Sequence, residues 1–190
     1  MEGKRLCRSC YEAVLPITLE NNKKAWGKPH PWRGDAAQSA REKTKFAGDF
    51  MRLREKYAPL SWSDGEICIR VAATPQELTD EGNTLHHCVG GYHRKHAAET
   101  DVIFFVRRAR RPERSWYTLD IRMDTDVPRE VQLHGYRNEW CDRGRLHIPR
   151  RVRDFCERWE REVLLPWAAE QRDKQRDKQT NTKKRKRRIA

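Results

Sequence analysis

The sequence predicts an α+β protein, in which an antiparallel meander of three to four strands packs with helices. Short runs of alternating apolar and polar residues within 60–167 are typical of strands, and the turns between them are short. Runs with apolar residues every three to four positions flank them, as in amphipathic helices. Hydrophobic residues make up only 36% of the 190-residue chain, against roughly 45–50% in an average domain. Part of the chain is therefore expected to lie outside any core.

Charge divides the chain into three parts. Residues 1–59 carry 13 basic and 7 acidic side chains, residues 60–167 carry 18 of each, and residues 168–190 carry 10 and 3. We expect a basic N-terminal arm over 1–59, a folded domain over 60–167 and a disordered basic tail over 168–190. The sequence shows neither an apolar run long enough to span a membrane nor a signal peptide, so a cytoplasmic location is expected.

The first helix is expected over residues 38–57, as a helical part of the N-terminal arm. Phe46, Phe50, Leu53 and Tyr57 recur at helical spacing and form a single apolar stripe. One buried face therefore predicts that this part of the arm packs on the domain.

A second helix is expected from Pro75 to about Leu85. Thr74 can cap its N-terminus, proline suits the first helical position, and Glu77 completes a capping box three residues after the cap. Gly82 is a weak point, since glycine inside a helix costs about 1 kcal/mol relative to alanine.

The remaining elements follow from alternation and from turn residues. Strands are expected over 66–72, 102–107, 115–123 and 129–134, the last three as a meander. A final helix is expected to begin at Pro149 and to end at Pro166, with Trp159 in its apolar stripe.

Chemically reactive side chains are densest between Glu81 and Tyr92, in the run EGNTLHHCVGGY. This run contains a carboxylate, two imidazoles, a thiol and a phenol, next to a Gly-Gly pair that permits a sharp turn. The last expected strand and its end supply further polar groups. The candidate catalytic residues are His86, His87, Cys88, Gln132, His134 and Asn138.

This run, followed by VIFFVRR, YTLDI and the Q-x-x-G-x-x-N spacing of Gln132, Gly135 and Asn138, resembles the PcfJ-like domain family. The resemblance covers roughly residues 66–165. It implies a bacterial protein of conjugative plasmids, integrative elements or prophages, associated with DNA transfer. It implies no defined reaction.

Three interpretations of the candidate residues stay open. A metal site would combine one of them with distant ligands, because neighbours on a helix point about 100° apart and zinc takes four ligands or three and a water. Alternatively, Cys88 is a nucleophile activated by a base such as His87 or His134. In the third interpretation these side chains line a non-covalent polar pocket or simply pack in the core.

Cys7 and Cys10 form half of a zinc site, without a second pair at the expected spacing. We therefore predict no cofactor, with zinc at this pair as the exception.

Basic residues gather at one hairpin turn, at the start of the last helix and at the C-terminus. The candidate nucleic-acid-binding residues are Arg107, Arg108, Arg110, Arg111, Arg150, Arg151, Lys183, Lys184, Arg185, Lys186, Arg187 and Arg188. Such groups attract polyanions by releasing condensed counterions, without reading sequence. The favoured hypothesis is a mobile-element accessory protein that binds DNA or RNA through phosphates. The alternatives are an enzyme acting on nucleic acid or nucleotides and a module that recruits other mobile-element proteins.

Overall fold

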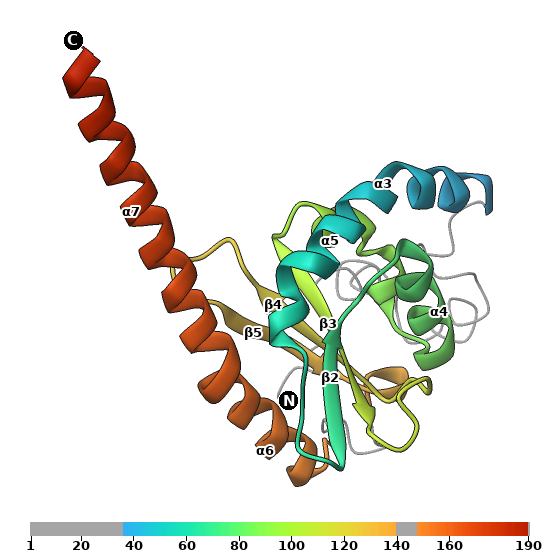
Figure 1. Ribbon diagram of the computed structural model, residues 1–190. Coiled ribbons are helices and arrows are strands. Elements are labelled where there is room, and N and C mark those ends of the chain that lie inside the picture. The colour runs from blue at the N-terminus through green and yellow to red at the C-terminus, as the bar shows by residue number, and fades with distance from the viewer. Residues whose placement is uncertain (1–35, 140–147, 190) are drawn as a thin grey trace, which may run out of the picture.

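Five antiparallel strands form one sheet whose order follows the chain, in a computed structural model that describes residues 36–139 and 148–189 (Figure 1). The strands are β1 (Trp62–Ser63), β2 (Ile67–Val71), β3 (Asp101–Arg108), β4 (Tyr117–Arg122) and β5 (Arg129–His134). The predicted α+β class and the meander are confirmed. Strand β1 was not predicted, because two residues are too few to show alternation.

Helices cover both faces of this sheet. They are α3 (Ala36–Tyr57), α4 (Pro75–Leu85), α5 (His93–Ala97), α6 (Arg150–Trp159) and α7 (Leu165–Ile189), with short turns η1 (Ala58–Leu60), η2 (Cys88–Gly91) and η3 (Tyr136–Glu139). The central strand β3 is buried on both sides up to Arg107. Its alternate residues therefore enter two separate cores, Val102, Phe104 and Val106 one and Ile103 and Phe105 the other.

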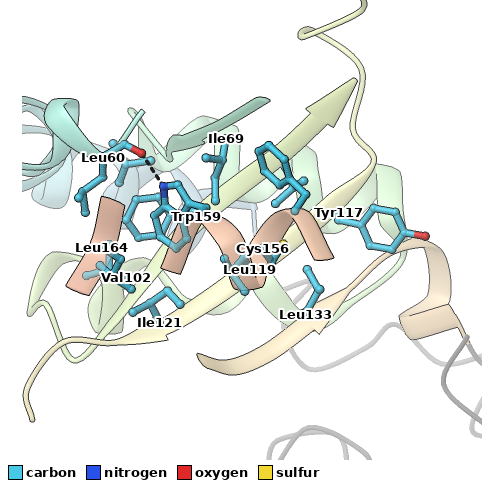
Figure 2. Packing of buried hydrophobic residues seen from close by; sticks show 14 of the residues in the cluster. Leu60, Ile69, Val102, Tyr117, Leu119, Ile121, Leu133, Cys156, Trp159 and Leu164 are labelled. Carbon is cyan, nitrogen blue, oxygen red and sulfur yellow. Dashed lines mark hydrogen bonds between the residues drawn. The ribbon is translucent and has the colours of Figure 1, made fainter. Parts of the chain in front are cut away.

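Helix α6 covers the first face, with Trp159 at its centre (Figure 2). The Trp159 side chain is fully buried, and its Nε1–H donates to the Leu60 carbonyl oxygen at 2.8 Å. The last turns of α3 add Leu53 and Tyr57 to the same core. Truncation of such a buried aromatic side chain typically costs about 3–5 kcal/mol, so the contact between α6 and the sheet is a major source of stability.

The second face is covered by α4, η2, α5 and the first half of α3. Phe46 and Phe50 of α3 pack there with Leu78, Val89 and Phe105. The predicted α3 stripe is thus one continuous face that serves both cores. This second face also carries the polar site described below.

Helix α4 begins at Pro75 with Thr74 as its cap, as predicted, but the Glu77 carboxylate binds the N–H of Ala73, one residue before the cap, so the predicted capping box is only half formed. The Thr74 hydroxyl oxygen accepts a hydrogen bond from the Glu77 N–H at 3.2 Å. The Glu77 carboxylate accepts a hydrogen bond from the Ala73 N–H at 2.7 Å and pairs with the Arg70 guanidinium of β2. These contacts fix the N-terminus of α4 to the end of β2.

The C-terminal part of the chain corrects two predictions. Pro166 does not end the last helix, because a π-helical segment, η4 (Glu160–Leu164), leads directly into α7. In this wider turn the Leu165 N–H bonds to the Glu160 carbonyl, just before the proline that lacks an N–H of its own.

Residues 168–189 are helical rather than disordered. They contain neither glycine nor proline, and Lys174 pairs with Glu170 at 2.7 Å, one helical turn away. Helix α7 projects beyond the folded body (Figure 1). In the described part of the chain, no helix is long and apolar enough to span a bilayer.

Candidate functional site

Five of the six candidate catalytic residues line one cavity on the second face of the sheet. His87 and Cys88 reach it from the turn at η2, and Gln132, His134 and Asn138 from β5 and η3. The cavity has a volume of about 20 Å³, enough for about one water molecule. We refer to it as the polar cavity.

The sheet register explains how the strand residues meet. His134 lies opposite Thr118, and Gln132 lies opposite Asp120, in the pairing of β4 with β5. Directly opposed residues on antiparallel strands place their side chains on the same face. All four side chains therefore line the floor of the polar cavity.

A glycine contact brings η2 against the sheet. Helix α4 ends at His86 in the left-handed conformation (φ 54°), and the His87 N–H then bonds to the Gly82 carbonyl at 3.2 Å. A Cβ on Gly82 would lie 2.7 Å from the Gly90 nitrogen, so only glycine permits this close return. The predicted weak point in α4 is thus the place where the chain folds back and presents His87 and Cys88.

His86 does not belong to the cavity, which corrects the prediction. Its side chain is exposed, and its ring contacts Tyr136 edge-on with the centroids 5.3 Å apart. Its backbone role as the left-handed cap of α4 accounts for this, because the turn points the side chain away from the sheet.

A buried ion pair lies beside the polar cavity. Glu81 and Arg107 are 2% and 4% exposed, and Arg107 Nη2 lies 2.6 Å from Glu81 Oε2. The hydroxyl of Ser115 donates to the same oxygen at 2.6 Å, and that of Thr118 donates to Oε1 at 2.8 Å. Burial lowers the pKa of Arg107, and the Glu81 charge opposes this effect. Arg107 is therefore not available to nucleic acid, which corrects that prediction.

The same network fixes the His87 ring. Thr118 Oγ1 lies 3.3 Å from His87 Nε2. Because the threonine hydroxyl gives its proton to the Glu81 carboxylate, its oxygen accepts from His87, which places a proton on Nε2. In the neutral ring Nδ1 is then the basic nitrogen.

Asp120 is a cavity residue that sequence reasoning missed. It is 4% exposed, and its Oδ1 has no hydrogen-bond partner. Burial, and secondly the charge of Asp101, raise the pKa of Asp120 to about 7, while Lys95 and Arg122 act in the opposite direction. A carboxyl group of this kind exchanges a proton near neutral pH. The available signal was an aspartate alternating with apolar residues in YTLDI.

Backbone irregularities surround the cavity. The pairing of β4 with β5 shifts register between Asp120 and Ile121, opposite Val131. Arg137 and Asn138 both adopt left-handed conformations (φ 50° and 58°). Bulges and left-handed non-glycine residues are enriched near functional sites. The left-handed turn at Arg137 and Asn138 brings the Asn138 side chain, which is 9% exposed, to the cavity.

The two predicted arginine clusters meet around one tryptophan. The guanidinium carbon of Arg108, in the β3–β4 hairpin, lies 4.8 Å from the centroid of the Trp116 ring, and that of Arg151, at the start of α6, lies 5.4 Å from it. Trp116 is half-buried at the edge of the first core. We call Arg108, Arg110, Arg111, Arg150 and Arg151, all exposed, the arginine surface.

A family model described as PcfJ-like protein matches residues 27–143, more than half of the chain. The chain belongs to the PcfJ-like family. No curated protein and no solved structure gives a significant match.

The region that matches the PcfJ-like family contains every residue of the polar cavity. Within the run EGNTLHHCVGGY, Leu85 and Val89 are buried, Gly82 allows the backbone of Gly90 to approach it, and Glu81 pairs with Arg107. His87 and Cys88 are the members that reach the cavity. Most of the motif of this PcfJ-like protein thus packs the chain against the sheet, and this packing places His87 and Cys88 at the cavity.

Metal ligands do not gather in the part of this PcfJ-like protein that the structure describes, where no group of three or more His, Cys, Asp or Glu side chains could hold an ion. Cys7 and Cys10 lie outside the described residues. Cys68, Cys88 and Cys156, the cysteines within the described residues, form no disulfide.

Proposed function

We propose that this PcfJ-like protein is a mobile-element accessory protein that binds nucleic acid, mainly through phosphate contacts of the arginine surface and of the basic end of α7. The observation that carries the proposal is the shared contact of Arg108 and Arg151 with Trp116. Two cationic groups from distant parts of the chain are thus held against the same aromatic ring. Guanidinium groups held in this way suit phosphate, which they bind with paired N–H donors.

The arginines of this surface form few ion pairs within the described part of the protein, so their guanidinium N–H groups are left for a binding partner. Arg150 has a partner in Asp154, at 3.5 Å, with its own side chain 93% exposed. Arg108, Arg110 and Arg111 form no ion pair with the described part of the chain. Exposed charges without local neutralisation attract condensed anionic polymers most strongly.

Phosphate contact fits this surface better than base stacking. The Trp116 ring already carries guanidinium groups, so it offers less open face to a base than an unoccupied aromatic side chain would. The proposed binding is therefore independent of sequence and strongly dependent on salt.

Helix α7 supports a second point of attachment. Residues 183–188, KKRKRR, lie near the end of this 25-residue helix, which spans about 37 Å at 1.5 Å per residue. The backbone of α7 projects beyond the folded body (Figure 1), so this segment would contact the polymer at a point separate from the arginine surface.

Fluorescence anisotropy tests the proposal with labelled duplex DNA, single-stranded DNA and RNA across a salt series. The full-length protein should bind at least one of them, with affinity falling steeply as salt rises. Arg108→Gln with Arg151→Gln should lower the slope of log affinity against log salt by about 2, since each phosphate contact contributes about 0.9 on duplex DNA. Arg161→Gln serves as the matched control, because it changes another exposed arginine in η4, which directly follows α6. Absence of binding to all three polymers at moderate salt would refute the proposal.

A further inference from the structure

The polar cavity contains hydrogen-bonding groups that phosphate binding does not use. The carboxyl group of Asp120 and the carboxamides of Gln132 and Asn138 line it together. Asp120 is 4% exposed, and its Oδ1 has no hydrogen-bond partner. A buried polar atom left in this state is costly unless a ligand or an ordered water completes it. The cavity therefore suits a ligand that donates a hydrogen bond to Asp120.

We propose that the polar cavity binds the exocyclic amino group of an unpaired nucleobase, with Asp120 as the acceptor and the amide groups of Gln132 and Asn138 beside it. This inference rests on the proposed nucleic-acid binding and names the part of the polymer that enters the protein. Phosphate contacts of the arginine surface do not distinguish bases. A preference among bases therefore measures the contribution of the cavity.

The volume of the cavity limits what can enter it. It measures about 20 Å³, which holds about one water molecule. An amino group is similar in size to a water molecule, whereas a whole base is several times larger. Only one edge of a base can therefore enter, and its ring stays at the mouth of the cavity.

The charges around the cavity favour a neutral donor over an ammonium group. Lys95 and Arg122 act on Asp120 and also pair with Asp101, at 2.9 Å each. When Asp120 is ionised, these four side chains contribute two negative and two positive charges. An ammonium group would lose its hydration and add an unbalanced positive charge. An aromatic amino group donates its N–H without bringing a charge into the protein.

The ionised form of Asp120 distinguishes bases by the group that each presents. A carboxylate only accepts hydrogen bonds. Cytosine, adenine and guanine carry an exocyclic amino group, whereas uracil and thymine carry only carbonyl oxygens, whose lone pairs would face the carboxylate. A site built to accept an N–H group rejects an analogue that lacks it, because the buried acceptor stays unpaired.

The base must be unpaired, because Asp120 is buried. A base that remains stacked in a duplex cannot bring its edge to a group inside a protein. Gln132 and His134, on the edge strand β5, are half-buried, whereas Asp120 lies deeper. The amino group would therefore enter over β5.

The residues that follow β5 suit the remainder of the nucleotide. Tyr136 lies in sequence between His134 and Asn138, which both line the cavity, and it is 51% exposed. The guanidinium carbon of the exposed Arg137 lies 5.3 Å from the centroid of the Tyr136 ring. An aromatic surface and a cation are thus next to the cavity, as in sites that hold an unpaired base and its phosphate.

The test compares fluorescein-labelled oligomers of deoxycytidine and of deoxyuridine, each about twelve nucleotides long, by anisotropy with the full-length protein at pH 8. Burial raises the pKa of Asp120 to about 7, so its carboxylate form predominates at this pH. The deoxycytidine oligomer should bind at least about fivefold more tightly, with the same salt slope because the phosphates are the same. Equal affinities would refute the inference but leave the proposed function standing, which fails only if no polymer binds.

Asp120→Leu replaces the carboxyl group with an apolar side chain of similar shape. The variant should bind the two oligomers with affinities within about twofold of each other, and a retained preference would refute the role of Asp120. Leu119→Val, a neighbouring change on the opposite face of β4, is the matched control and should keep the preference. Arg108→Gln with Arg151→Gln should weaken binding of both oligomers equally, because these arginines are proposed to contact phosphate.

A modified oligomer decides the matter if Asp120→Leu does not fold. Replacing both amino hydrogens of each cytosine with methyl groups removes the donors and keeps the ring and the phosphates. The wild-type protein should bind this oligomer no more tightly than the deoxyuridine oligomer. Binding as tight as that of unmodified oligo-deoxycytidine would overturn the proposal.

Discussion

Gly82 in α4 and Gly90 in η2 are in direct backbone contact, and a Cβ on Gly82 would lie 2.7 Å from the Gly90 nitrogen and 3.0 Å from its Cα. This contact folds the chain back immediately after α4, so it places His87 and Cys88 on the sheet.

Gly82→Ala should therefore destabilise the protein, although alanine favours helices. The added methyl group meets backbone atoms that cannot move aside, and such overpacking typically costs about 1–3 kcal/mol. Gly48→Ala in α3 is the matched control, because the added Cβ would have nothing within 4 Å. The control should gain about 0.5–1 kcal/mol. Urea denaturation of both variants measures the difference, and a stabilised Gly82→Ala would contradict the close return.

The buried pair of Glu81 and Arg107 predicts strongly non-additive effects on stability. Glu81→Ala removes one partner and leaves the guanidinium charge buried, at an expected cost of about 3–5 kcal/mol. Replacing both residues, as in Glu81→Met with Arg107→Leu, should cost clearly less than the sum of the two single changes, since no isolated charge remains. Thermal or urea denaturation of the three variants forms the cycle. Additive losses would mean that the pair is not coupled in the folded protein.

The raised pKa of Asp120 predicts that this residue lowers stability as pH rises. The folded protein keeps the proton up to a pH of about 7, whereas the unfolded chain loses it near pH 4. Between these values the unfolded state binds fewer protons, so the free energy of unfolding falls with increasing pH. The penalty starts above pH 4 and is complete once the pH passes about 7.

Asp120→Asn should remove this penalty, because asparagine resembles the neutral carboxyl group in shape. We expect it to stabilise the protein at pH 8 by roughly 2–4 kcal/mol relative to its effect at pH 4, from a shift of about three pH units at 1.36 kcal/mol each. The exposed Asp126→Asn is the control and should show no such pH dependence. Equal effects of Asp120→Asn at both pH values would show that Asp120 is ionised throughout.

Periodicity predicted the packing elements because apolar faces must be buried wherever they occur. The stripe from Phe46 to Tyr57 and the alternation in β2 and β4 each produced the expected element. Arg107 and Arg108 show that periodicity does not predict which of two adjacent polar side chains is buried. They are adjacent in VIFFVRR, but one points under α4 to Glu81 and the other to solvent. Only the position of α4 over the sheet distinguishes them.

The candidate site was predictable as a set of residue types but not in its geometry. His86 and His87 are chemically identical neighbours, and the left-handed conformation at His86 decides which ring reaches the cavity. Asp120 was not among the candidate residues, because strand alternation places it on the face opposite Leu119 and the pattern of a single strand does not show what covers that face. Pro166 was read as a helix end because a π-helical turn that accommodates proline leaves no pattern in the sequence.

Removing the Trp116 ring should weaken nucleic-acid binding although the charge of the protein does not change. Each contact between a guanidinium group and an aromatic ring contributes about 0.5–1 kcal/mol at exposed sites, and Trp116 makes two. Trp116→Leu should release both arginines and weaken binding by up to about 1–2 kcal/mol, or roughly 5- to 30-fold at constant salt, with only a small effect on the salt slope because the charges remain.

Trp62→Leu provides the matched control for Trp116→Leu. Trp62 is also a half-buried tryptophan at the edge of the first core, and Arg158 lies 4.9 Å from the centroid of its ring. That arginine is bound to Asp64 at 2.5 Å, so its charge is locally neutralised. Both variants should lose comparable stability, but only Trp116→Leu should weaken binding in the anisotropy assay. Equal loss of binding in the two variants would assign the effect to general destabilisation and not to the arrangement of the arginine surface.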